Sequence, residues 1–149
     1  MQARMNVVKP AAAGYKAMLA LESYINGGPV PQSTLELVRL RVSQINGCAF
    51  CVNMHATDAK KAGETDERLW SVAAWREAPF FTDEERAALA LAEAATRIGD
   101  NPDGVPDDVW NDAADHYDEE SLAALVMVIA AINAWNRINV TVRNPAASR

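Results

Sequence analysis

Cysteine is scarce in this sequence, with two among 149 residues. Two cysteines are too few for a scaffold held by disulfides, so a hydrophobic core must stabilise the fold. Glycine and proline number seven each, which excludes a collagen-like or low-complexity chain. Half of the residues are hydrophobic, which excludes disorder as the main state, and the length predicts one domain over residues 1–149.

Positive charge and long apolar runs are also limited. Lysine and arginine number 14 against 20 acidic residues, a net charge of −6 that argues against a nucleic-acid or anionic membrane surface. The longest apolar run, residues 122–132, is shorter than the roughly 18 residues of a membrane span. The first ten residues lack an apolar core followed by a cleavage site, so we expect no secretory signal and a cytoplasmic location.

Apolar residues at helical spacing fill the segments between glycines and prolines. No alternation of period two persists, so the sequence predicts an all-α fold, a bundle of about seven helices. Thr82 and Glu85 form a capping box at the start of the fifth helix. The expected helices cover about residues 10–26, 33–46, 48–62, 66–78, 83–98, 106–117 and 119–138.

The last expected helix is apolar around most of its circumference between Leu122 and Trp135. Such a helix is buried on several sides, either inside the domain or between subunits. Its polar residues Asn133, Asn136 and Arg137 need partners if they are buried, and we interpret them as structural or at a subunit contact.

Tryptophans add to this hydrophobic surface. Trp75, Trp110 and Trp135 occupy helical positions and are interpreted as core or interface residues. Together with the apolar helix they supply more hydrophobic surface than one small helical domain covers, so we expect a homo-oligomer.

One segment combines both cysteines with one of the two histidines. Cys51 follows Cys48 by three positions, and His55 follows Cys51 by four, which places all three on one face of a helix. Two thiols at this spacing can form a disulfide. In the first turn of a helix, free N–H groups and the helix dipole lower the pKa of a thiol. An imidazole one turn away can act as base or as cationic partner of the thiolate.

Glu36 joins this set if Gly47 reverses the chain into a helical hairpin. Glu36 and His55 then lie about 16 and 12 Å from the turn, close enough for contact directly or through one water. A carboxylate in this position fixes the tautomer of the imidazole and raises its basicity. Glu36 also follows Ser33 by three positions, which fits a capping box, so both roles stay open.

The cysteine pair has three interpretations at this point. A redox dithiol is favoured; a buried structural thiol pair and a metal site formed by Cys48, Cys51 and His55 remain alternatives. A structural metal site needs four ligands and a catalytic one three plus water, and the only other histidine, His116, is some sixty residues away. We therefore expect no metal and no other cofactor.

The stretch E-L-V-R-L-R-V-S-Q-I-N-G-C-A-F-C-V-N-M-H, residues 36–55, resembles the alkylhydroperoxidase D-like group of the carboxymuconolactone decarboxylase superfamily. The segments A-W-R-E-A-P-F-F-T-D-E-E-R-A-A-L-A and I-N-A-W-N-R resemble it too, so the similarity extends over about residues 10–140. The resemblance implies an all-helical fold, assembly into trimers or hexamers, and thiol-dependent peroxidase activity. It matches Glu36, Cys48, Cys51 and His55 to the proton-relay and thiol positions of the family.

One position departs from the best-characterised branch, which has a second histidine between the cysteines where this chain has Phe50. We expect that part of the proton relay to be weaker. Cys51, one turn from His55, is the expected attacking thiol for hydrogen peroxide or an organic hydroperoxide, and Cys48 the thiol that forms the disulfide. The implied reductant is a lipoyl-bearing or thioredoxin-like protein. The alternative function is a thiol redox switch or binding scaffold of the same superfamily without peroxidase activity.

Overall fold

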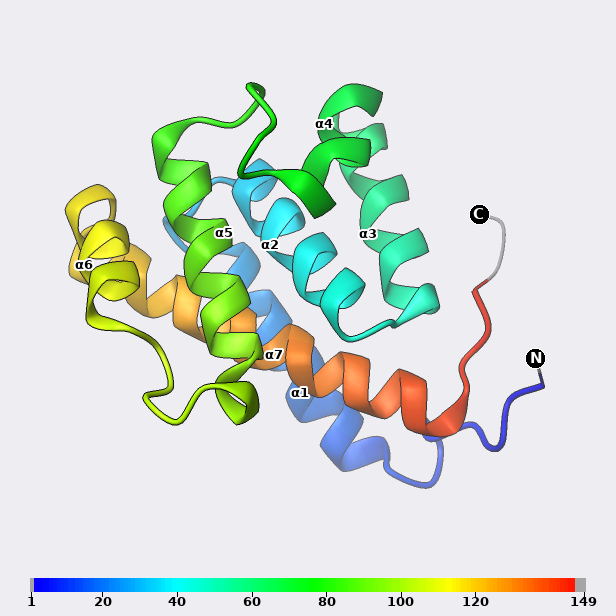
Figure 1. Ribbon diagram of the computed structural model, residues 1–149. Coiled ribbons are helices and arrows are strands. Elements are labelled where there is room, and N and C mark those ends of the chain that lie inside the picture. Colours follow the sequence, from blue (N-terminus) through cyan, green and yellow to red (C-terminus); the bar gives the residue numbers. More distant parts are fainter. Residues whose placement is uncertain (1, 147–149) are drawn as a thin grey trace.

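The computed structural model describes residues 2–146, and within them it contains helices but no strand (Figure 1). This confirms the predicted all-α fold and the number of α-helices in the described range. The α-helices are α1 (Ala12–Asn26), α2 (Gln32–Ile45), α3 (Ala49–Lys61), α4 (Asp66–Ser71), α5 (Asp83–Thr96), α6 (Asp107–His116) and α7 (Glu119–Val142), with 3₁₀ helices at Val72–Ala74 and Ile98–Asp100.

Most helix boundaries follow the local signals in the sequence. Gly47 adopts a left-handed φ of 64° between α2 and α3, a conformation that glycine reaches without strain. The predicted capping box of Thr82 and Glu85 is present at the start of α5. Two predicted boundaries were wrong. The fourth helix changes to a 3₁₀ turn after Ser71, and α7 continues four residues beyond Ile138 because its first break is the left-handed Arg143.

Helix α2 lies at the centre of the molecule, between α3 and α5 and against α7 (Figure 1). Because neighbours cover it on several sides, every residue from Thr34 to Leu40 is buried. That stretch includes the charged residues Glu36 and Arg39, which are 8% and 3% exposed. Charged groups at such positions need partners inside the protein, and these partners form the site described below.

Two hydrophobic clusters lie on opposite sides of α2. The first, between α1, α2, α5 and α7, contains both cysteines together with residues such as Val38, Val42 and Leu125. The second, formed by α2, α3, α4 and α5, contains the residues Leu37, Leu40, Leu69, Trp75, Phe81 and Leu89. The cysteine pair is therefore part of the packed interior beside α7.

Helix α7 is long and apolar enough to cross a membrane by length and composition alone. Its buried residues, however, belong to the first hydrophobic cluster, and α1, α2 and α5 pack against it. This helix therefore packs inside the domain, one of the two environments that its apolar circumference predicted. Its last turns carry polar residues into the site.

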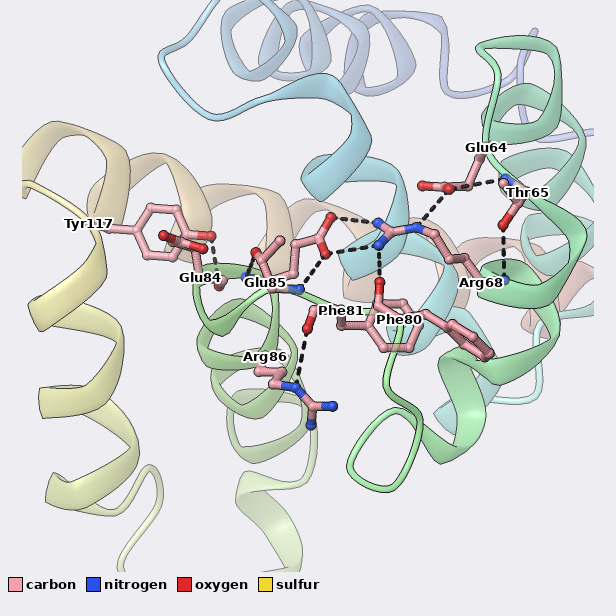
Figure 2. Close-up of polar contacts among 10 residues, drawn as sticks. Glu64, Thr65, Arg68, Phe80, Phe81, Glu84, Glu85, Arg86 and Tyr117 are labelled. Carbon is pink, nitrogen blue, oxygen red and sulfur yellow. Dashed lines mark hydrogen bonds and ion pairs between the residues drawn. The ribbon is translucent and has the colours of Figure 1, made fainter.

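Hydrogen bonds of Arg68 connect α4 to the start of α5 (Figure 2). Its guanidinium donates to both carboxylate oxygens of Glu85, at 2.5 and 3.1 Å, to Glu64 at 2.7 Å, and to the carbonyl oxygen of Phe80. Glu85 is also the capping-box residue of α5, so one carboxylate orders both the helix start and the connection before it. None of these residues lines the cavity at the cysteines, so we assign this network a structural role.

Large apolar side chains remain exposed on several faces of the chain. Trp75 is buried and Trp135 is partly buried, as predicted, but Trp110 is 42% exposed. Other exposed residues are Leu19, Tyr24, Trp70, Phe80, Ile98 and Val126. We expect these surfaces to be covered in a homo-oligomer, so light scattering at micromolar concentration should give a trimer or a hexamer. A mass near that of the 16.2 kDa chain would contradict this prediction.

Candidate functional site

The two cysteines lie at the start of α3, as predicted from the end of the preceding helix at Gly47. Cys48 is the N-cap residue, and its Sγ accepts a hydrogen bond from the backbone N–H of Cys51 at 3.4 Å. Cys51 lies in the first turn of the helix. Both thiols are free and almost fully buried, at 1% and 0% exposure. Cys48 thus occupies a position where backbone N–H groups stabilise a sulfur anion.

Glu36 and His55 are in direct contact across the hairpin of α2 and α3. The distance between Glu36 Oε2 and His55 Nδ1 is 2.7 Å, which confirms the contact that the hairpin geometry predicted. The capping-box interpretation of Glu36 was wrong. The N-cap of α2 is Pro31, so the helix begins at Gln32, one residue before Ser33. Ser33 therefore lies exposed inside the first turn and caps nothing.

Two further donors hold the carboxylate of Glu36. Arg39 Nη1 lies 2.7 Å from Glu36 Oε1, and Gln32 Nε2 lies 3.0 Å from the same atom. Burial raises the pKa of Glu36, but the hydrogen bond and charge of His55 and the guanidinium of Arg39 outweigh it, so the pKa lies below its usual value. Glu36 is therefore ionised, and His55 Nδ1 must donate to it. The proton-exchanging nitrogen of His55 is then Nε2.

Arg39 connects this pair to α1 and α7. Its Nη2 donates to Glu22 at 2.7 Å and to Asn26 at 2.8 Å, and Trp135 Nε1 donates to the other oxygen of Glu22 at 2.9 Å. The sequence analysis missed Arg39 and Glu22. For Arg39 the sequence did hold a clue, because Glu36 and Arg39 are charged residues among the apolar residues of α2.

The two sulfurs differ in their tendency to ionise. The hydrogen bond from the Cys51 side chain lowers the pKa of Cys48 to about 7, against burial, with help from backbone N–H groups and Asn136. The same hydrogen bond, with burial and the charge of Cys48, raises the pKa of Cys51. Of the two thiols, Cys48 therefore ionises more readily, and the remaining proton lies between the two sulfurs.

A cavity of about 710 Å³ opens beside the pair. Cys51, His55 and Glu36 line one part of it, whereas Cys48 does not line it. Most of the remaining lining residues are apolar and come from α1, α3, α7 and the N-terminal segment, among them Met5, Val8, Tyr15, Leu19, Met54, Trp135 and Ile138. Of the two cysteines, Cys51 is thus the one that borders the cavity.

The asparagines of α7 behave differently from one another. Asn133 accepts from Asn46, which matches its predicted structural role. Asn136 is buried and donates to Ser43, but it also hydrogen-bonds the cysteine sulfurs. Neither these two nor Arg137 lines the cavity. Asn139, which the sequence analysis did not select, lines it and donates to Cys51 Sγ at 3.4 Å.

Across residues 2–146 no group of three histidine, cysteine or acidic side chains is placed to hold a metal ion. The geometry of the described residues therefore does not support the metal-site interpretation of Cys48, Cys51 and His55.

An all-α fold with a buried dithiol, a histidine and a carboxylate defines the class of this protein, and comparison with known proteins identifies its family. Residues 12–94 match the model of the carboxymuconolactone decarboxylase family. The uncharacterized protein YdfG of Bacillus subtilis is 43% identical over 149 residues, 100% of both chains. The chain belongs to this family and is an alkylhydroperoxidase D-like member of its superfamily.

Two solved structures are similar over most of the chain. The first is ATU0492 of Agrobacterium tumefaciens, a protein of unknown function proposed to be an antioxidant defence protein AhpD. It superposes with a TM-score of 0.94 at 35% sequence identity, and the match covers 99% of this chain and 100% of ATU0492. The debrominase Bmp8 has a TM-score of 0.76 and 19% identity, covering 89% of this chain and 70% of its own. At that identity Bmp8 shares the fold alone, so the superfamily's fold carries more than one chemistry.

Proposed function

We propose that this protein is a thiol-dependent peroxidase in which Cys51 attacks a hydroperoxide, Cys48 closes a disulfide, and Glu36 and His55 relay protons. The observation that carries the proposal is the placement of Cys51 and His55 on one cavity, with Cys48 directly behind Cys51. A thiol that shares a cavity with an imidazole, which a carboxylate orients through a 2.7 Å contact, has the groups that activate a thiol nucleophile.

The first step oxidises Cys51. The proton of the Cys51 thiol moves to the Cys48 sulfur, and the Cys51 thiolate attacks the terminal oxygen of R–O–O–H. The O–O bond breaks, Cys51 becomes a sulfenic acid, and the leaving alkoxide takes a proton from Nε2 of protonated His55 to depart as an alcohol. Glu36 stabilises the imidazolium that supplies this proton, because its carboxylate contacts Nδ1 at 2.7 Å.

The second step forms the disulfide. The Cys48 sulfur attacks the Cys51 sulfur, the S–O bond breaks, and hydroxide leaves with the Cys48 proton as water. Two thiols and one hydroperoxide thereby give one disulfide, one alcohol and one water. The lower pKa of Cys48 suits this role, because a thiolate is the nucleophile for the second attack as well.

Cavity size and lining favour an organic hydroperoxide over hydrogen peroxide. The volume of about 710 Å³ is many times the roughly 30 Å³ that a water-sized molecule occupies. Apolar walls gain free energy from contact with an apolar substituent, which hydrogen peroxide lacks.

Burial of both sulfurs also selects the reductant. A lipoyl arm is slender enough to enter the cavity that Cys51 borders, whereas a thiol held on the surface of a folded protein is not. We therefore propose a lipoyl-bearing protein as partner in preference to a thioredoxin-like one.

Steady-state turnover tests this proposal. With dihydrolipoamide as reductant, the protein is expected to reduce cumene hydroperoxide with a higher kcat/KM than hydrogen peroxide, and to turn over more slowly with reduced thioredoxin. A disulfide that forms reversibly without turnover by either reductant would favour the alternative, a thiol redox switch.

A further inference from the structure

Asn139 contacts the sulfur that the proposed cycle oxidises. It lies near the end of α7, is 9% exposed, and its Nδ2 is 3.4 Å from Cys51 Sγ. The same nitrogen donates to the carbonyl oxygen of Trp135 at 3.0 Å. Its two donor hydrogens thus account for both contacts, one to its own helix and one to the thiol.

A neighbouring residue fixes the orientation of this amide. Asn144 Nδ2 donates to Asn139 Oδ1 at 2.9 Å, and the Asn144 backbone N–H donates to the Asn139 carbonyl oxygen at 2.9 Å. Arg143 makes this possible with a left-handed φ of 56°, which turns the chain back over the end of α7. If the Asn139 amide were flipped, its NH₂ group would face the NH₂ group of Asn144, and its oxygen would face the carbonyl oxygen of Trp135. The observed orientation avoids both conflicts and directs an N–H at the sulfur.

We infer that Asn139 is a further catalytic residue of the proposed peroxidase, whose amide stabilises the anionic sulfur of Cys51. The inference rests on the proposed function for its catalytic meaning. An amide neither gains nor loses a proton near neutral pH, so it lowers the energy of the thiolate without adding a titration.

Three titratable groups lie near Cys51. Cys48 is the N-cap of α3, His55 is one turn further along α3, and Glu36 of α2 contacts His55 Nδ1. Cys48, burial and the charge on Cys48 raise the pKa of the Cys51 thiol, and the hydrogen bonds from Asn136 and Asn139 oppose that rise. The two asparagines are therefore the neutral groups that favour ionisation of Cys51, and Asn139 alone of the two also lines the cavity.

Alkylation of Cys51 as a function of pH, in a Cys48→Ser background, tests the inference. Asn139→Leu removes the donor at similar size and is expected to raise the Cys51 pKa by about one unit and slow single-turnover oxidation by about 10- to 100-fold. Asn133→Ala is the matched control, because this asparagine of α7 bonds to Asn46 and Thr96 and not to sulfur. It is expected to lower stability and leave the Cys51 pKa unchanged.

Asn144→Ala provides a second, milder variant if Asn139→Leu does not fold. It frees the amide from its orienting contact and is expected to raise the Cys51 pKa by less than Asn139→Leu does. An unchanged Cys51 pKa in the folded variants would overturn the inference. Because alkylation needs no peroxide, this readout stays valid even if the native protein fails to turn over hydroperoxide, an outcome that would overturn the proposed function instead.

Discussion

Replacing His55 with alanine is expected to slow oxidation of Cys51 by a hydroperoxide by about 10²–10⁴-fold, the range typical of a positioned proton-transfer group. The variant loses the imidazole that protonates the leaving alkoxide and leaves the carboxylate of Glu36 without its partner at 2.7 Å. Stopped-flow measurement of single-turnover oxidation with cumene hydroperoxide gives the rate. Wild-type rates in a folded His55→Ala variant would contradict the relay.

Glu36→Gln is expected to cost less than His55→Ala, because it removes an orienting charge and leaves the imidazole. Ser33→Ala is the matched control, since this exposed residue of the same helix turn makes no capping bond. The pKa of Glu36 is depressed in the folded protein, so its stabilisation is present above the usual value of 4.5 and is lost as the pH falls through the lower folded pKa. The difference in unfolding free energy between wild type and Glu36→Gln should shrink over that same interval.

Replacing the cysteines singly is expected to give the largest effect and to separate their roles. Cys51→Ser should abolish reaction with hydroperoxide, because the remaining Cys48 does not line the cavity. Cys48→Ser should still react once, more slowly because the sulfur that takes the Cys51 proton is gone, and stop at the sulfenic acid of Cys51, since the chain has no other cysteine. Mass spectrometry of the oxidised variants detects the single added oxygen atom, and a dione that traps sulfenic acids confirms its nature.

The opposite pattern would assign the attack to the other sulfur. Reaction in Cys51→Ser and none in Cys48→Ser would show that Cys48, which has the lower pKa, is the attacking thiol. Far-ultraviolet circular dichroism of both variants controls for the fold, because each serine replaces a side chain of the packed interior.

Sequence reasoning located the part of the site that depends on one hairpin. Gly47 marks the reversal, and the helical rise then places Glu36 opposite His55, which the structure confirms at 2.7 Å. The same glycine also predicted that Cys48 and Cys51 lie at the start of the next helix, α3. These relations involve neighbouring helices and a single turn, so local geometry is enough to derive them.

The rest of the site depends on how distant helices pack. Glu22 of α1 reaches Arg39, and Asn139 of α7 reaches Cys51 across 88 positions of the sequence, and no local periodicity encodes either approach. The misassigned cap has a local cause instead. Ser33 fits the capping-box pattern, but Pro31 is the N-cap, so the serine lies two positions too late to cap the helix.

Titration of the free thiols with hydroperoxide tests the central claim most directly. One equivalent of cumene hydroperoxide is expected to remove both thiols of the wild-type chain, to yield one equivalent of the alcohol, and to leave an intramolecular disulfide between Cys48 and Cys51 that dihydrolipoamide reduces. Two thiols that persist after one equivalent of peroxide would contradict the account.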